Sequence, residues 1–381
     1  MAQTPGKTIF ISAGDISGDI HAANLVQALK ALDPAVRIIA IGGPRLKACA
    51  DEFVIDLASQ GLLGFIEPLK KLPLFARLLK QVRHILRTQH PACFVAVDFY
   101  GLNHQFLKVA KQENIPAYYY VTPQVWASRQ YRAKRLAALT KKMYVIYPFE
   151  PSFHKQRGGN AVFLGNPLLD KMPAPLPKNF DIKDPQTYPW KLGLLPGSRR
   201  GEILRLTPVF YQTFKKVCKT YPHTQAYIFL LPDANEQDFI ELLGEQPPAN
   251  FHFVKETDYK LRAQMDFLLA CSGTATLENA LLGVPMLVAY KLFWPTYLIA
   301  RMVVKVNYIS LVNLLADKPP LVQELIQQDA TVENCAAVVQ DMFAHPQKLA
   351  QMHQALLALR ASWGQPGVAK RAAADLLKDL V

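Results

Sequence analysis

The chain has 381 residues, half of them hydrophobic, which is enough for two domains with separate cores. Lys and Arg number 43 against 30 Asp and Glu, and this net charge of +13 favours anionic partners such as nucleic acid, phosphorylated small molecules or an anionic membrane surface. The five cysteines form no Cys-x-x-Cys pair and no apolar run approaches the roughly 20 residues of a membrane span, which argues against a disulfide framework, a zinc site and a transmembrane protein.

Short apolar runs alternate with longer amphipathic stretches in the first half of the chain. The runs predict strands at residues 8–12, 37–41, 94–98, 117–121 and 143–147. Between the first two, Leu25, Leu29 and Leu32 share one face of a helix predicted over residues 20–32. This alternation predicts a parallel sheet with helices on both faces. The N-terminus leads directly into the first strand without the pattern of a signal peptide, so we expect a cytoplasmic protein.

The first predicted strand leads into the stretch "ISAGDISGDIHAANL", which has the layout of a nucleotide-binding loop. The stretch is not G-x-G-x-x-G, and Asp15 and Asp19 bring carboxylates to a place where a phosphate prefers bare amides. Another carboxylate, Asp98, lies at the end of a later predicted strand. Ligands bind beyond the carboxyl ends of parallel strands, so Asp98 is a candidate for chemistry, and the alternative is an ordinary helix N-cap.

Residues 67–90 form a basic amphipathic stretch, and from Pro68 to Val97 the chain has no acidic residue. Apolar residues, beginning with Phe75, recur there at helical spacing. Lys70, Lys71 and Arg77 are among the basic residues that surround them. Such a helix suits an anionic lipid surface, and the alternative is a packed helix with a solvated basic face.

A second basic stretch, "YYYVTPQVWASRQYRAKRL", follows another predicted strand. Its Pro123 and Trp126 are candidates for the wall of a binding site. Two interpretations stay open for the basic residues that follow them: contact with phosphates, or a solvated face. These residues are Arg129, Arg132, Lys134 and Arg135.

Six prolines between residues 164 and 190 block regular structure and predict a linker or hinge. The alternation then resumes, with strands predicted at residues 192–195, 226–231, 251–255, 267–271 and 286–290. The tail, residues 347–381, has a helical pattern. The chain therefore reads as two α/β domains joined by a proline-rich hinge.

Two turns in the second half are candidates for binding a diphosphate. In "LLPGSRRGEI", Ser198 and Arg199 lie where a helix begins, and the free amides of a helix start suit an anion. In "SGTATLENALLG", residues 272–274 occupy the same position after a strand. Glu278 lies four residues beyond Thr274 on the same side of a helix, where a carboxylate can accept two ribose hydroxyls. The alternative makes these residues plain caps and dipole partners.

The sequence has no metal-ligand spacing, no D-x-D motif and no nucleic-acid-binding signature. We therefore expect no metal ion, no other cofactor and no nucleic-acid partner.

In their order along the chain, these motifs resemble the lipid-A-disaccharide synthase family, whose members are inverting glycosyltransferases of the two-domain GT-B fold. The resemblance covers nearly the whole chain. It runs through "ISAGDISGDIHAANL", "VDFYGLN", "VTPQVWA", "LGNPLLD", "LLPGSRRGEI" and "SGTATLENALLGVPMLVAYK" to "VNYISLVNLLADKPPLVQELIQQDAT". Two positions differ from the family pattern: Asp15 stands where the family has Glu, and Ser128 stands where it has a second tryptophan.

The resemblance implies an α/β fold of the GT-B type, with two Rossmann-like doubly wound parallel-sheet domains that face a cleft and a C-terminal helical tail. We expect an N-terminal acceptor-binding domain at residues 1–165, a Pro-rich hinge at 166–189 and a C-terminal UDP-sugar-binding domain at 190–345. The helical tail, residues 346–381, is expected to pack back toward the N-terminal domain.

The activity that the resemblance implies joins UDP-2,3-diacylglucosamine to 2,3-diacylglucosamine 1-phosphate (lipid X), with formation of a β(1→6) disaccharide and UDP. It also implies peripheral association with the cytoplasmic face of the inner membrane, and it is compatible with a homodimer. Alternatives are another GT-B enzyme acting on a lipid-linked acceptor, a UDP-sugar epimerase, and a catalytically inactive homologue that binds a nucleotide or lipid.

On this basis Asp98 is expected to be the base that takes the acceptor proton, with Asp15 as its orienter or substitute. The residues expected to bind the UDP-sugar are Ser198, Arg199, Ser272, Gly273, Thr274 and Glu278. The residues expected to contact the acceptor or the lipid are Ser17, Asn103, Gln124, Trp126, Lys70, Lys71, Phe75 and Arg77.

Overall fold

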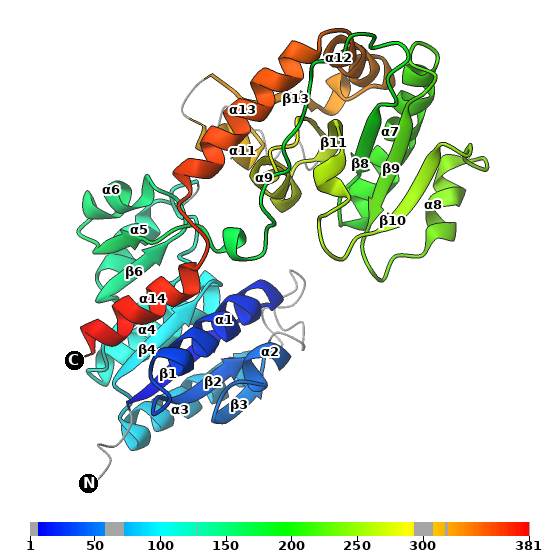
Figure 1. Ribbon diagram of the computed structural model, residues 1–381. Coiled ribbons are helices and arrows are strands. Elements are labelled where there is room, and N and C mark those ends of the chain that lie inside the picture. The colour runs from blue at the N-terminus through cyan, green and yellow to red at the C-terminus, as the bar shows by residue number, and fades with distance from the viewer. Residues whose placement is uncertain (1–6, 58–71, 128, 293–307, 317–318, 381) are drawn as a thin grey trace. The chain divides into compact units, whose positions relative to one another are not determined.

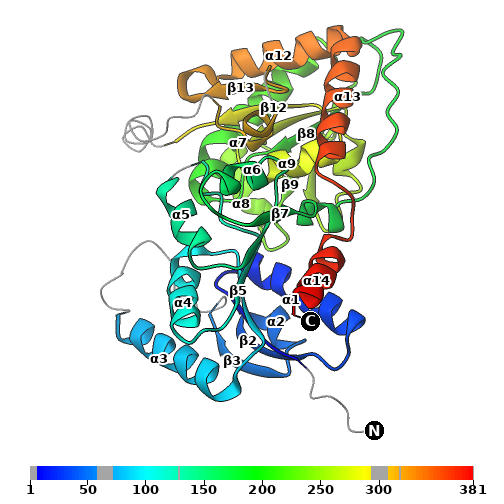
Figure 2. The same cartoon turned by 90° about the vertical axis from the view of Figure 1, so that its left-hand side faces the viewer.

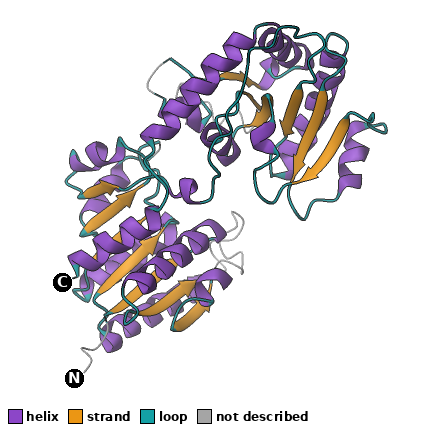
Figure 3. Ribbon diagram, viewed as in Figure 1, coloured by secondary structure: helices purple, strands orange, loops and turns teal. Residues whose placement is uncertain are grey.

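A computed structural model describes residues 7–57, 72–127, 129–292, 308–316 and 319–380 (Figure 1). The chain divides into two compact units. Unit 1 comprises Met1–Asp170 and Trp363–Val381, and unit 2 comprises Lys171–Ser362. Each unit is built on an open sheet of parallel strands with helices packed around it (Figure 3).

In the described part of unit 1 the sheet has seven parallel strands in the order β3-β2-β1-β4-β5-β6-β7. The strands are β1 (Thr8–Ala13), β2 (Arg37–Gly42), β3 (Glu52–Asp56), β4 (Cys93–Val97), β5 (Ala117–Tyr120), β6 (Lys142–Val145) and β7 (Ala161–Phe163). The helices are α1 (Ile16–Leu32), α2 (Pro44–Lys47), α3 (Leu72–Gln89), α4 (Tyr100–Gln112), α5 (Tyr131–Ala137), α6 (Glu150–Lys155), α14 (Val368–Asp379) and the short 3-10 helix η1 (Pro167–Asp170).

Neighbouring residues of a strand point to opposite faces of the sheet. In unit 1 both faces carry apolar side chains, and helices cover both of them. Phe10 of β1 packs with Phe94 of β4 and Phe106 of α4 on one face. Ile9 and Ile11 pack on the other face, in the layer that contains α1 and α14. Figures 1 and 2 show α1 and α14 side by side in that layer. The sheet is therefore doubly wound, as the sequence predicts.

Unit 2 repeats the arrangement, with six described parallel strands in the order β10-β9-β8-β11-β12-β13. The strands are β8 (Lys191–Leu195), β9 (Gln225–Leu230), β10 (Phe251–Lys255), β11 (Phe267–Cys271), β12 (Met286–Tyr290) and β13 (Gln323–Ile326). The helices are α7 (Arg200–Cys218), α8 (Glu236–Leu243), α9 (Thr274–Leu281), α11 (Leu311–Leu315), α12 (Val332–Ala344), α13 (Pro346–Ser362) and the 3-10 helices η2 (Arg262–Gln264) and η3 (Gln327–Asp329). Trp190 anchors the core of this unit and stacks on Phe343 of α12, with ring centroids 4.0 Å apart.

The predicted strands and the two Rossmann-like sheets are confirmed. The helix predicted from residue 20 begins earlier, at Ile16, because the Asp15 carboxylate accepts the amide of Gly18 and caps it. The sequence pattern does not predict β3, β7 and β13. All three are edge strands with mostly half-exposed side chains, so their apolar pattern is weak.

Between η1 and β8 the described chain contains no helix or strand, as its prolines predict. The tail is helical, with α13 in unit 2 and α14 in unit 1. Among the described residues, the structure contains no helix whose length and apolar character would let it cross a membrane.

In each sheet the strand order reverses at one place, and the candidate residues gather there. The reversal lies between β1 and β4 in unit 1 and between β8 and β11 in unit 2. Open parallel sheets bind ligands at such a switch point, beyond the carboxyl ends of the strands. Asp15 and Asp98 follow the two strands of the first reversal, and Ser198 and Ser272 follow those of the second.

Candidate functional site

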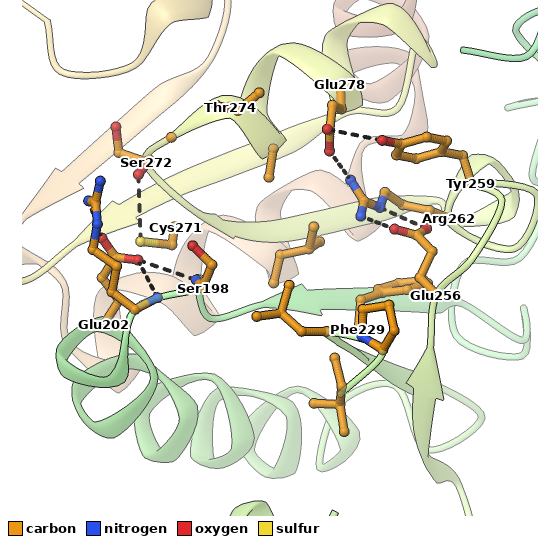
Figure 4. A pocket seen from close by; sticks show the side chains of 18 residues that line it. Ser198, Glu202, Phe229, Glu256, Tyr259, Arg262, Cys271, Ser272, Thr274 and Glu278 are labelled. Carbon is orange, nitrogen blue, oxygen red and sulfur yellow. Dashed lines mark hydrogen bonds and ion pairs between the residues drawn. The ribbon is translucent and has the colours of Figure 1, made fainter. Parts of the chain in front are cut away.

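A cavity of about 420 Å³ opens at the switch point of unit 2 (Figure 4). This volume is in the range of small-molecule sites. All six residues expected to bind a UDP-sugar line it, together with residues that follow β9 and β10. The six are Ser198, Arg199, Ser272, Gly273, Thr274 and Glu278.

The turn between β8 and α7 depends on Gly197 and Glu202. Gly197 has a φ of +112°, and a Cβ at this position would lie 2.6 Å from an Oε atom of Glu202. The Glu202 carboxylate accepts hydrogen bonds from the amides of Ser198 (3.3 Å) and Arg199 (3.2 Å) and from the Arg199 guanidinium (3.0 Å). The amides of Ser198 and Arg199, directly before α7, are therefore already occupied. A ligand there meets the exposed Ser198 hydroxyl and the Arg199 side chain, which is 79% exposed.

The turn between β11 and α9 is open toward the cavity. A Cβ on Gly273 would meet no other atom within 4 Å, and Thr274 is exposed. The Ser272 hydroxyl donates to the carbonyl of Ile309 at 3.0 Å and so holds the turn in place. Because the first amides of a helix have no partner within it, the start of α9 offers donors to an anion.

Glu278 belongs to a network at the other end of the cavity (Figure 4). Its carboxylate accepts hydrogen bonds from the Tyr259 hydroxyl (3.0 Å) and the Arg262 guanidinium (2.9 Å). Arg262 is buried and also pairs with Glu256, the pKa of which is raised by burial although the Arg262 charge opposes the rise. A carboxylate has about four lone-pair positions, so two hydrogen bonds leave Glu278 able to accept hydroxyls from a ligand.

The sequence motifs do not single out several residues that line this cavity. Glu256 follows β10, and Leu231 and Pro232 follow β9, so the rule that singled out Asp98 and Ser198 would also have found them. Tyr259 has a φ of +57°, and neither it nor Arg262 belongs to a motif. Their roles depend on contacts with Glu278 that only the folded chain makes.

In unit 1, Asp98 follows β4 in a left-handed backbone conformation, with a φ of +48°. Phe99 is also left-handed (φ +35°), and such conformations are strained for residues other than glycine. The Asp98 carboxylate accepts the amide of Phe99 at 2.8 Å. The N-cap residue of α4 is Phe99, without a side-chain cap bond, so Asp98 is not the helix cap that the alternative interpretation requires.

Two side chains hold Asp98 in this conformation. The amide of Asn103 donates to the carbonyls of Val97 and Asp98, both at 3.0 Å. The Tyr119 hydroxyl donates to the Asp98 carbonyl at 2.6 Å. Asn103 is only 1% exposed, so the expected contact between Asn103 and the acceptor is corrected to a positioning role behind Asp98.

Burial of the Asp98 carboxyl raises its pKa to about 6. The nearby Asp15 carboxylate raises the pKa further, and the hydrogen bond from the Phe99 amide opposes both effects. A carboxyl with this pKa changes its proton occupancy close to neutral pH, which suits a group that takes up a proton.

In the loop after β1, both carboxylates accept hydrogen bonds from backbone amides. Asp15 accepts the amide of Gly18 at 2.7 Å. Asp19 is buried and accepts the amides of Gly43, Arg45 and Leu46 at 2.8–3.0 Å, which ties α1 to the start of α2. The two carboxylates of the loop therefore hold the start of α1 and connect it to α2.

The same loop packs directly against the turn that carries Asp98. A Cβ on Gly14 would lie 2.6 Å from the ring of Phe99, so a residue with a side chain does not fit. Ser17, on the first turn of α1, is exposed and its side chain is open to solvent.

Gln124 and Trp126 lie beyond β5 in an aromatic cluster of unit 1. Trp126 is half-buried and packs edge-to-face on Tyr147 and Phe149, with ring centroids 5.9 and 5.0 Å away. Gln124 donates to the Tyr147 hydroxyl at 3.3 Å. These contacts form a rigid wall near the carboxyl edge of the sheet, and Phe149 stays 38% exposed on it.

Helix α3 buries its apolar face in the core of unit 1. Leu78 and Val82 belong to that core, and Phe75 packs against it half-buried. Arg77 is exposed on the opposite face. The described part of this basic stretch is thus a packed helix with a solvated basic face, and Lys70 and Lys71 lie outside the described residues, as does Ser128.

Comparison with known sequences identifies relatives along the whole chain. A family model described as lipid-A-disaccharide synthetase matches residues 9–374. The lipid-A-disaccharide synthase of Syntrophus aciditrophicus is 34% identical over 375 residues, which covers 96% of either chain. That of Geobacter metallireducens is 32% identical over 384 residues, which covers 100% of this chain and 99% of the relative.

Solved structures with little sequence identity share the fold. The structure described as an S. aureus MnaA-UDP complex matches with a TM-score of 0.62 at 13% identity, over 98% of both chains. Acinetobacter baumannii MurG matches with a TM-score of 0.60 at 14% identity, over 98% of this chain and 99% of its own. These structures support the GT-B fold.

The burial of Asp98 predicts that it lowers stability at neutral pH. Its pKa is about 6 in the folded chain and near 3.9 when unfolded, so its stabilising effect is present below pH 4 and lost as the pH rises through 6. The variant Asp98→Asn should therefore raise the free energy of unfolding at pH 8 by about 1–3 kcal/mol, and by less at pH 5. Denaturant unfolding at both pH values tests this, and a gain that is larger at pH 5 contradicts it.

Proposed function

The chain belongs to the lipid-A-disaccharide synthase family and is a disaccharide-forming glycosyltransferase, and we propose which of its residues carry the reaction. In this proposal the enzyme joins UDP-2,3-diacylglucosamine to 2,3-diacylglucosamine 1-phosphate, forms a β(1→6) disaccharide and releases UDP, and the family to which the chain belongs supports this reaction. The acceptor hydroxyl attacks the donor sugar from the face opposite UDP. Its proton passes to a base, and the bond between the sugar carbon and the diphosphate oxygen breaks.

In this proposal Asp98 is the base. The observation that carries the assignment is a buried carboxyl with a raised pKa, held in a strained backbone conformation at the switch point of unit 1. Strain of this kind persists only where the surroundings enforce it, and Asn103 and Tyr119 do so through the Asp98 carbonyl. Asp15 is a helix cap whose charge raises the pKa of Asp98, so we assign it an orienting role.

The cavity of unit 2 binds the UDP part of the donor in this proposal. The start of α9 at Gly273 and Thr274 holds the diphosphate through backbone amides, with the Ser198 hydroxyl and the Arg199 guanidinium beside it. Glu278 accepts the ribose hydroxyls. Figure 4 supports this order, since Ser198 and Ser272 lie toward one end of the cavity and the network of Glu278 lies at the other.

We also propose that the enzyme works in the cytoplasm, on the surface of the inner membrane. Both substrates carry acyl chains, and the excess of basic residues favours an anionic surface. Because the apolar face of α3 is packed inside unit 1, charge is the main attraction that this helix offers. Arg77 and the neighbouring Lys70 and Lys71 are the residues that we expect to face the lipid.

The variant Asp98→Asn tests the base. It keeps the shape of the side chain but cannot take a proton, so turnover should fall by roughly 10²–10⁴ while UDP affinity stays unchanged. In the native enzyme, kcat should fall with acidity below about pH 6, because protonation of Asp98 removes the base. The comparison variant is Asp15→Asn, which keeps the helix cap but removes the charge that raises the pKa of Asp98, so its turnover should fall much less than that of Asp98→Asn and its acid limb should shift to lower pH. Normal turnover of Asp98→Asn combined with loss in Asp15→Asn would reverse the assignment.

The variant Glu278→Ala tests the ribose contact. UDP affinity should fall by about 1.5–3 kcal/mol, the range for a hydrogen bond to a charged group. Affinity for 2′,3′-dideoxy-UDP should change little, because this analogue lacks the hydroxyls that Glu278 is proposed to accept. Calorimetric titration of both ligands measures the difference. An equal loss for both would mean that Glu278 acts only by supporting Arg262.

Charge reversal tests the membrane surface. Changing Lys70, Lys71 and Arg77 to Glu should reduce sedimentation with phosphatidylglycerol vesicles, since each basic residue near such a surface contributes about 1 kcal/mol, and should leave UDP affinity intact. High salt should reduce binding of the native protein in the same assay.

A charge-matched control separates a local surface from net charge. Lys155, Lys183 and Lys219 are exposed on other parts of the chain. Their change to Glu gives the same net charge and should leave vesicle binding nearly native. An equal loss of vesicle binding in the two triple variants would mean that net charge, and not the surface formed by residues 70, 71 and 77, causes the binding.

A further inference from the structure

A groove of about 460 Å³ lies in unit 1 between α4 and the start of α5, and the proposed function does not use it. We call it the α4–α5 groove. One wall is the face of α4 from Tyr100 to Lys108, and the other is formed by Arg129, Arg132 and Arg135. The sequence leaves two interpretations open for these arginines, and the structure brings them together around one concave surface.

The cations of this groove have no carboxylate partners among the described residues. Lys108, Arg129 and Arg135 are exposed, and Arg132 is half-buried. Other cations of unit 1 pair with acids, as Arg83 and Arg87 do with Glu113, and Lys142 does with Asp375 and Asp379. Four cations that pair with no carboxylate in the described part of the chain make a site that an external anion can neutralise.

The groove is also rigid on its inner side. The Arg132 guanidinium carbon lies 4.2 Å from the centre of the Tyr100 ring, and Tyr100 stacks on His104 with ring centroids 5.0 Å apart. These contacts fix one guanidinium in place, which lowers the entropy cost of binding an anion. His104 is buried, and its pKa is lowered first by burial and then by the charges of Lys108, Arg135 and Arg132.

The backbone at the entrance is strained as well. Arg129 has a φ of +55°, a left-handed conformation that is uncommon outside glycine, just before α5 begins. Strained residues of this kind concentrate at binding sites, because the surrounding structure must enforce the conformation. The strained residue Arg129 and the unpaired cations therefore lie in the same groove.

We propose that the α4–α5 groove binds the phosphomonoester of the acceptor sugar. This inference rests on the proposed function, because it takes the acceptor to be a glucosamine that carries a 1-phosphate. A phosphomonoester carries about −1.5 to −2 charges at pH 7 and three acceptor oxygens, which several arginines and a lysine can satisfy together.

The position of the groove fits this ligand. Tyr100, on its α4 wall, follows the proposed base Asp98 by two residues, and both lie at the carboxyl edge of the same sheet. In the acceptor, the attacking hydroxyl is on C6 and the phosphate is on C1, so the two groups project from the two carbons that flank the ring oxygen. A base and a phosphate site on neighbouring parts of one unit would therefore bind these two groups together. The diphosphate of the donor has its own site in unit 2.

The test compares the native enzyme with the variant Lys108→Gln/Arg135→Gln. Lys134→Gln is the matched control, because Lys134 is an exposed cation of α5 that does not line the groove. Each protein is assayed with the phosphorylated acceptor and with the same diacylglucosamine without its phosphate. The native enzyme and the control should prefer the phosphorylated acceptor by about tenfold or more in kcat/KM, and the double variant should lose most of this preference with an unchanged KM for the donor.

A binding assay makes the result independent of turnover. The full chain is titrated with glucosamine 1-phosphate and with glucosamine, and only the former should bind, about tenfold more weakly to the double variant and more weakly in high salt. If no protein turns over either acceptor but this difference in binding persists, the proposed function fails and the phosphate site stands.

Three results would overturn the inference. The first is the same preference for the phosphorylated acceptor in the native enzyme and the double variant. The second is an equal loss in Lys134→Gln, which would indicate net charge alone. The third is a loss of binding to phosphatidylglycerol vesicles with unchanged binding of glucosamine 1-phosphate, which would make the groove a contact for lipid headgroups instead.

Discussion

The reversal of strand order beside the first strand of each sheet fixes where this molecule can act. Strands β1 and β4 are neighbours in unit 1, as are β8 and β11 in unit 2. The chain leaves β1 and β4 toward helices on opposite faces, so the ends of the two strands stay uncovered. Asp98 follows β4, and the turn from Ser272 to Thr274 follows β11. Each of these groups is therefore held by a buried strand on one side and is accessible on the other.

The two switch points have opposite electrostatic character. In unit 1, burial and the neighbouring Asp15 carboxylate raise the pKa of Asp98 toward neutrality, which favours uptake of a proton. In unit 2 the acids have partners: Arg262 pairs with Glu256 and Glu278, and Glu202 accepts the amides of Ser198 and Arg199 directly before α7. The start of α9 remains for an anion. The basic excess of the chain does not accumulate at this cavity and instead gathers on unit 1.

The sequence by itself determined the architecture and pointed to candidate residues beyond the ends of the strands. Runs of buried apolar residues mark interior strands, because a strand covered on both faces must be hydrophobic throughout. Turn motifs after those strands identified the Ser198 and Ser272 turns, Asp98 and Glu278, since the ends of parallel strands share one edge. The edge strands β3, β7 and β13 escaped prediction because solvent contact weakens their pattern.

Only the tertiary structure decided what each polar side chain does, because its partners come from distant parts of the chain. Asn103 has the pattern of a ligand residue, yet the fold buries it against the Asp98 carbonyl. Glu202 occupies amides that the sequence leaves free, and Arg262 meets Glu278 from another loop. Whether a basic stretch packs, faces solvent or lines a groove depends on which helix lies opposite. A local pattern fixes the backbone, but hydrogen-bond partners and burial, which set pKa and access, are properties of the assembled fold.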